Sequence, residues 1–232
     1  MEKLIYPVWK SDGESDEEFR DKLLEKLAPK LLEGDILRLK VCVVDEHVAE
    51  AAPYRMENTR PAMSGVIMIW TNSSVYRQAL EQLIEEHVAR YTGYLVTESE
   101  PLVSDSRGAA PGERTPGMNQ VVFLQRPPRL CVQEWLDIWH GSHTRIALET
   151  QSTFGYRQNV IIRSLTYAAP HYDAMIEENF PQEAISSRAA FYDAVGNEEL
   201  YQQREKEMVD SCMRFIDFDK IDCIPMSEYI FK

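Results

Sequence analysis

The residues with the clearest chemical potential lie in one stretch, Trp135–His143 (WLDIWHGSH). Trp135, Trp139 and His143 are spaced i, i+4 and i+8, so on a helix they share one face. Burial against this apolar face lowers the pKa of a histidine and favours the neutral imidazole, which can act as a general base. A core histidine with one satisfied hydrogen bond is the ordinary alternative. His140, three residues earlier, could orient His143 or bind substrate.

Two pairs of residues further along the chain could join His143. A Tyr156 hydroxyl could donate to a developing oxyanion, and the Asn159 amide could hold a substrate oxygen. Three residues apart on a strand, these two side chains point to opposite faces, so we expect one of them to line a pocket. Glu177 and Glu178 are adjacent in a predicted strand, so one must face inward. An inward Glu177 beside His143 would form an acid–base or orienting pair.

The remaining candidates concern the wall of a pocket and a metal. His171 lies in a predicted loop before a strand, where histidines are usually solvated but can also serve a site. His140 and His143 have a spacing that suits a metal, but no convergent carboxylate is recognisable, and we predict no metal and no cofactor. The residues expected to shape an apolar substrate pocket are Trp135, Trp139, Tyr156, Tyr167 and Phe180.

Composition and charge exclude several classes of protein. The chain has 232 residues, 44% of them hydrophobic and 27% charged, as in a globular protein. Its net charge of −13 argues against a nucleic-acid partner. No apolar run approaches the roughly 20 residues of a membrane span. Met1–Tyr6 enters a strand-like run at once, without the apolar core of a signal peptide, so we expect a cytoplasmic protein. Four scattered cysteines suggest neither redox chemistry nor zinc.

The elements that position these residues follow a simple order. In the first half, apolar runs and helical periodicity predict strand, helix, strand, strand, helix, strand, which is the order of a ferredoxin-like unit. The predicted strands are Leu4–Trp9, Ile36–Val44, Val66–Trp70 and Tyr91–Glu98, and the helices run from Phe19 to Leu31 and from Val75 to Val88. Ser104–Gly117 has no apolar residue larger than alanine or proline, which predicts an exposed, mobile linker.

The second half repeats the first. Phe19 aligns with Trp135 at an offset of 116 residues (135 − 19), and the same offset places Leu27 on His143. Further along, the offset falls to 109. We therefore predict two units, residues 1–103 with a degenerate site and residues 118–232 with the active site. The second unit also contains an additional helix, since 182–194 and 198–215 both look helical. The second copy thus has a histidine where the first has a packing leucine. Because a buried imidazole is unfavourable unless it is paired, this replacement favours a functional role for His143 over a purely structural one.

These residues together resemble a known family. The second half, Asn119–Phe231, resembles the EthD-type domain of the dimeric α+β barrel superfamily. The matching features are Arg126 at the end of the first strand, Trp139-x-x-x-His143, Tyr156-Arg157-Gln158-Asn159, Asp173…Glu177 and Phe215-Ile216-Asp217. The first half resembles the family more weakly, with Leu27 where the family often has histidine. The second half departs from the pattern at His140, often a basic residue, and at Asn179-Phe180, often an aromatic pair.

The resemblance implies an α+β fold of two ferredoxin-like βαββαβ units in a dimeric-α+β-barrel-like arrangement within one chain. Similar proteins also pair as homodimers. Relatives include cofactor-free cyclases, dehydratases and decarboxylases of aromatic or polyketide-like compounds. We therefore expect a cofactor-independent lyase or cyclase (decarboxylation, dehydration or aldol-type C–C chemistry) with His143 as general acid/base, acting on a hydrophobic aromatic, phenolic or polyketide-like small molecule. The alternatives are a non-catalytic binding protein for such a ligand, and a haem-binding protein with His140 or His143 as axial ligand.

Overall fold

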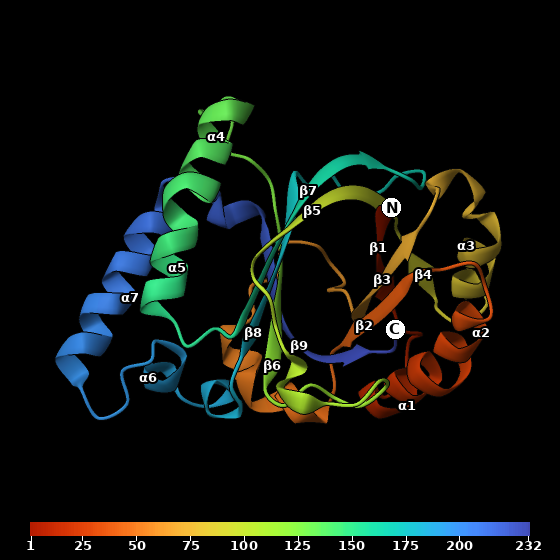
Figure 1. Cartoon of the computed structure of the whole chain (residues 1–232), viewed down its shortest axis with the longest axis horizontal. Helices are drawn as coiled ribbons and strands as arrows, with labels where there is room; N and C mark the ends of the chain where they lie inside the picture. The colour runs from red at the N-terminus through yellow and green to blue at the C-terminus, as the bar shows by residue number, and fades with distance from the viewer.

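The backbone forms a closed antiparallel barrel covered by helices on two opposite sides (Figure 1). The computed structural model describes residues 1–232. Eight strands close the barrel in the order β3-β2-β9-β6-β8-β7-β5-β1, with β1 returning to β3, and the short β4 adds to β1. The strands are β1 (Glu2–Trp9), β2 (Arg38–Val43), β3 (Gly65–Thr71), β4 (Arg90–Tyr91), β5 (Tyr94–Leu102), β6 (Met118–Leu124), β7 (Gly155–Ser164), β8 (Ala174–Phe180) and β9 (Ile221–Ile230).

The helices lie outside the barrel. Helices α4, α5 and α7 cover one side of it, and α1, α2 and α3 cover the other (Figure 1). Their bounds are α1 (Asp16–Asp21), α2 (Ala28–Leu32), α3 (Gln78–Glu85), α4 (Val132–Ile138), α5 (Thr144–Thr150), α6 (Arg188–Phe191) and α7 (Glu198–Met213). Two π-helical turns, 22–27 and 139–143, join α1 to α2 and α4 to α5. Each of these pairs is therefore one continuous, locally widened helix.

The predicted fold class is confirmed, because each half shows the strand order of a ferredoxin-like unit. The order is β5-β1-β3-β2 in the first half and β9-β6-β8-β7 in the second. The barrel closes where β2 pairs with β9 and β5 pairs with β7, so each half supplies an edge to the other. The sequence repeat has the same register as the strands. Glu2 pairs with Thr71 in the first half, and Met118 pairs with Phe180 in the second.

The repeat extends to the start of the covering helices. Ser15 caps α1 in a capping box with Glu18, and Cys131 caps α4 in the same way with Glu134, 116 residues later. Both helices then pass through a π-helical turn whose last residue is Leu27 or His143. The two side chains therefore occupy equivalent points between helix and sheet.

Two sequence predictions are wrong in detail. The continuous helix expected over 182–194 is instead a 3-10 turn, Gln182–Ile185, followed by the single-turn α6. The linker 104–117 is exposed only in part, because its end is held against β9. The Thr115 amide and hydroxyl donate to the carbonyl and carboxylate of Glu228, at 2.8 and 3.0 Å. Gly117 has a φ of +109°, and a Cβ there would lie 2.0 Å from the Phe180 carbonyl oxygen.

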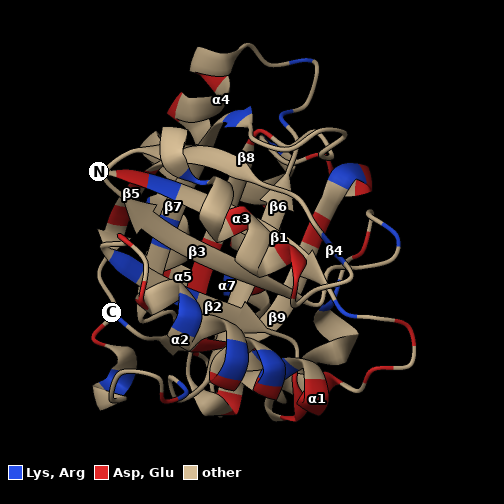
Figure 2. Cartoon of the chain, turned by 90° about the vertical axis from the view of Figure 1, so that its right-hand side faces the viewer, with Lys and Arg blue, Asp and Glu red and all other residues tan.

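Inside the barrel, charged side chains from both halves form an ionic network. Its buried members are Lys3, Lys40, Arg157, Glu177 and Glu228, and its partly exposed members are Glu98 and Glu100. Charged residues lie on the strands as well as on the outer helices (Figure 2). Lys3 Nζ lies 2.6 Å from Glu98 and 2.8 Å from Glu177, and Lys40 contacts both Glu177 and Glu228. Most of these contacts join a cation of one half to a carboxylate of the other.

We expect removal of one cation from this network to destabilise the barrel strongly. Lys40→Met leaves the buried Glu177 and Glu228 carboxylates with less positive charge, and breaking a buried ion pair in this way typically costs about 3–5 kcal/mol. Urea unfolding measures the change. Lys10→Met is the matched control, because its pair with Asp16 is at the surface and should contribute less than about 1 kcal/mol. Equal effects of the two substitutions would contradict the structural role of the network.

Candidate active site

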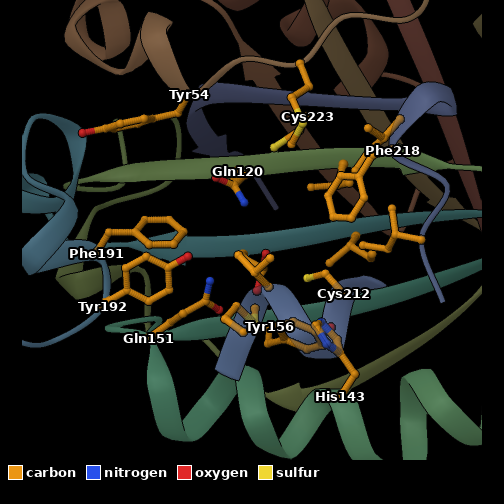
Figure 3. Close-up of a pocket in the computed structure, with 18 of the residues that line it drawn as sticks. Tyr54, Gln120, His143, Gln151, Tyr156, Phe191, Tyr192, Cys212, Phe218 and Cys223 are labelled. Carbon is orange, nitrogen blue, oxygen red and sulfur yellow. The ribbon is translucent and has the colours of Figure 1, made fainter. Parts of the chain in front are cut away.

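A cavity of about 190 Å³ lies between the second-half sheet and the helices that cover it (Figure 3). Fifteen of its 20 lining residues are hydrophobic. Tyr54 and Met56 of the first half also line it. Tyr54 lies on one side of the cavity, and Phe191 and Tyr192 lie together on another. Met56 is partly exposed at the rim, as are Val209 and Phe218, with 39–43% of their surface accessible. The site is therefore an apolar pocket with a route to solvent.

The repeat shows how the cavity differs from its counterpart in the first half. Three positions that hold fully packed aliphatic side chains in the first half carry polar side chains that line the cavity in the second. At offsets of 116, 116 and 109, Leu4, Leu27 and Ile69 are replaced by Gln120, His143 and Glu178. A hydrogen-bonding group in an apolar core is unfavourable unless it is paired. Three such replacements around one cavity make it the candidate site of the chain.

Glu178 is the most strongly perturbed of these groups. Its side chain is buried on the outer face of β8, and its Oε1 has no hydrogen-bond partner. Burial raises the pKa of the carboxyl to about 8, with a smaller opposing effect from a hydrogen bond to the Gln120 side chain. The carboxyl is therefore largely neutral at pH 7, and its pKa lies in the range where a group can both donate and accept a proton.

Glu177, the carboxylate predicted to pair with His143, lies on the other face of the same strand. It points into the barrel, where it accepts hydrogen bonds from Lys3, Lys40 and Asn159. These cations hold its pKa well below the usual range despite complete burial. The predicted pair with His143 is wrong. Both faces of β8 are buried, so the sequence of the strand has no polar face that would show which of the two glutamates points toward the helices.

His143 lines the cavity from the π-helical turn. Its Nδ1 lies 2.9 Å from Ser211 Oγ on α7, and its ring lies 4.5 Å from that of Phe215. Burial lowers the pKa of the imidazole to about 4, with a smaller effect from the charge of Arg214. The ring is therefore neutral at pH 7, as the sequence indicated. With so low a pKa, it serves better as a hydrogen-bonding group than as a proton acceptor near neutrality.

Tyr156 and the two tryptophans form one connected layer. Tyr156 lines the cavity and its hydroxyl accepts a hydrogen bond from Trp139 Nε1 at 3.2 Å. Trp135 packs against Trp139, with the ring centroids 5.1 Å apart, and its Nε1 donates to the Phe215 carbonyl, so the tryptophans support the cavity from behind. Asn159 points into the barrel. As expected, only one of Tyr156 and Asn159 reaches the pocket.

The remaining predicted site residues do not line the cavity. Phe180 stacks on Phe191 at 4.2 Å, one layer behind the wall. His140 is on the exposed side of the helix, because its neighbour Trp139 takes the inward direction. His171 is exposed near Asp173, and Tyr167 is completely exposed on the β7–β8 loop. The prediction that Tyr167 shapes the pocket is wrong.

The sequence predictions missed three polar residues of the cavity, Gln120, Gln151 and Arg188. Gln120 could have been found from the repeat, since it occupies the position of Leu4. Arg188 lies over the rings of Tyr54 and Tyr192 and forms an ion pair with Glu205 at 2.9 Å. The structure contains no group of three or more His, Cys, Asp or Glu side chains arranged to hold a metal. None of its helices has the length and apolar character needed to cross a membrane.

Solved structures with the same architecture cover the whole chain. An anthrone oxidase-like protein superposes with a TM-score of 0.56 at 10% identity, over 91% of its own length. The chain has the dimeric α+β barrel fold. A candidate chlorite dismutase matches with 0.51 at 9% identity, over 96% of its length, and a candidate monooxygenase from Fusobacterium nucleatum with 0.50 at 11%, over 92%. At such low identity the likeness concerns the fold alone. No protein-family model and no curated protein sequence matches the chain.

The raised pKa of Glu178 predicts how stability depends on pH. Between about pH 4.5 and 8 the folded protein keeps this proton while the unfolded chain loses it, so stability falls as pH rises. Glu178→Gln removes the effect. The variant should match the parent near pH 4 and exceed its unfolding free energy by roughly 3–5 kcal/mol near pH 9. Urea unfolding across this range tests the prediction, with exposed Glu183→Gln as control. A constant difference at every pH would contradict it.

The lowered pKa of His143 predicts the opposite dependence. The unfolded chain binds a proton below about pH 6.5 and the folded protein does not until about pH 4, so His143 makes the protein less stable as pH falls. His143→Leu combined with Ser211→Ala removes both partners of the buried hydrogen bond, and Leu27 shows that the fold accepts leucine at this point. Thermal unfolding should show equal or higher stability at pH 7, with an added gain of roughly 2 kcal/mol near pH 4.5. A loss at both pH values would indicate an essential structural histidine.

Proposed function

We propose that the protein is a cofactor-independent lyase or cyclase that acts on a hydrophobic aromatic, phenolic or polyketide-like small molecule in this cavity. The observation that carries the proposal is Glu178, a neutral carboxyl with an unpartnered oxygen in an apolar pocket. The proposal includes an EthD-type second half, which is supported by the Trp139-x-x-x-His143 and Tyr156-x-Gln158-Asn159 elements that contribute His143 and Tyr156 to the cavity.

The residues of the cavity can perform proton transfer without a further group. Ionised Glu178 can take a proton from a phenol or from a carbon next to a carbonyl, and the resulting acid can return it to a carbon or to a leaving oxygen. Both forms are populated near its pKa of about 8. His143 and Tyr156 are neutral groups that can hydrogen-bond the oxyanion or enolate that forms. We therefore assign the proton transfer to Glu178 and a hydrogen-bonding role to His143.

Haem does not fit this cavity. Its volume of about 190 Å³ is below the roughly 300–1,000 Å³ typical of pockets for drug-sized ligands. His140, one of the two axial ligands considered, lies on the exposed side of the helix and outside the cavity. The pocket is suited to a smaller, largely apolar molecule.

Turnover of a panel of phenolic acids and polyketide mimics, followed by chromatography and mass spectrometry, tests the proposal. Glu178→Gln should lower turnover of any substrate by roughly 10²–10⁴-fold, the usual contribution of a general acid–base group. Activity should change with pH around 8, whereas the exposed control Glu183→Gln should behave like the parent. Full activity of Glu178→Gln would remove Glu178 from the mechanism. Binding of a panel member without any turnover would favour the alternative of a ligand-binding protein.

A further inference from the structure

Gln151 is a second polar group left without a partner in the cavity. It follows directly after α5, is 7% exposed, and its Oε1 is buried without any hydrogen bond. Its side chain lies beside the cavity between Tyr192 and Tyr156 (Figure 3). Buried polar atoms in proteins are nearly always paired, so an unpaired one that lines a pocket points to a ligand.

Other polar side chains of the cavity have partners within the protein. The Tyr156 hydroxyl accepts a hydrogen bond from Trp139 Nε1, and His143 Nδ1 shares a hydrogen bond with Ser211 Oγ. The Arg188 guanidinium donates a hydrogen bond to the Glu205 carboxylate. By contrast, both Gln151 and Glu178 keep a buried oxygen that has no partner. These two oxygens are buried acceptors of the cavity that a ligand can satisfy, in addition to any contact with Gln120, His143 or Tyr156.

The size of the cavity limits the apolar part of the ligand. An engineered apolar cavity of about 150 Å³ binds benzene. At about 190 Å³, this cavity has room for one ring with small substituents and is too small for three fused rings. The aromatic side chains that line it, among them Tyr156, Phe191 and Phe215, are suited to contact with a flat ring.

We infer that the cavity takes a single aromatic ring carrying two hydroxyl groups, one bonded to Glu178 and the other to Gln151. This inference rests on the proposed function and narrows its substrate class. A hydroxyl both donates and accepts, so it pairs with Gln151 whichever way the amide is turned, and with Glu178 in either protonation state. A carboxylate in either place would lie close to an ionisable glutamate, and the Arg188 charge is already paired with Glu205.

A matched ligand series tests the inference by calorimetry at pH 7. The probes are toluene, phenol, the three dihydroxybenzenes, 3-methoxyphenol and the three-ring compound anthrone. At least one dihydroxybenzene should bind about 5- to 10-fold more tightly than phenol, the gain of one additional hydrogen bond. Methylation of one hydroxyl should remove that gain, and anthrone should not bind.

Variants then assign the second hydroxyl to its partner. Gln151→Met, similar in length but without the amide, should bind the preferred dihydroxybenzene no more tightly than phenol, whereas exposed Gln202→Leu should bind like the parent. Circular dichroism verifies that each variant is folded. The ligand series is measured on the parent protein, so it tests the inference even where a variant does not fold.

Two outcomes would overturn the inference. If toluene, phenol and the dihydroxybenzenes bind equally, or if anthrone binds best, the two-hydroxyl, single-ring ligand is excluded while the proposed proton transfer by Glu178 stands. If no member of the series binds, the inference is also overturned. In that case, turnover of larger substrates by the parent and its loss in Glu178→Gln decide separately whether the proposed function survives.

Discussion

The pairing of Glu177 with Lys3 and Lys40 inside the barrel is the interaction on which the rest of the site depends. Side chains alternate along a strand, so a carboxylate anchored to two buried cations fixes which face every residue of β8 presents. Glu178, the next residue, must then enter the layer between sheet and helices. A slip of one residue would exchange the faces on which Glu177 and Glu178 lie, and the cavity would lose its carboxyl from this position. The ionic network thereby maintains the neutral carboxyl of the cavity.

The duplication explains how a cavity between sheet and helices can hold polar groups in a stable fold. The first half fills the equivalent space with Leu4, Leu27 and Ile69, and its helices pack directly on the sheet. The second half keeps the capping box, the π-helical turn and the strand register, and changes the side chains at these points. The additional α6, together with α7, encloses the resulting space. The polar replacements are thus confined to one copy of the unit, and the barrel is the shared core of both copies.

The sequence predicted the fold because its two signals agreed. Apolar periodicity gave the elements, and the offset of 116 residues gave their repetition, down to the equivalence of Leu27 and His143. The neutral state of His143 also followed from its apolar neighbours. The choice between Glu177 and Glu178 could not be predicted, since β8 is buried on both faces and carries no alternation of polar and apolar residues. Gln151 was missed because only the folded structure shows that its amide oxygen is buried without a partner.

A carboxyl carbon-13 NMR titration of the protein measures the ionisation of Glu178 directly. The signal is assigned by its absence in Glu178→Gln. We expect a midpoint near pH 8 and a neutral carboxyl at pH 7. A midpoint near the usual value of about 4.3 for glutamate would contradict it, because the group would then be an ordinary ionised carboxylate and not an acid–base group tuned by burial.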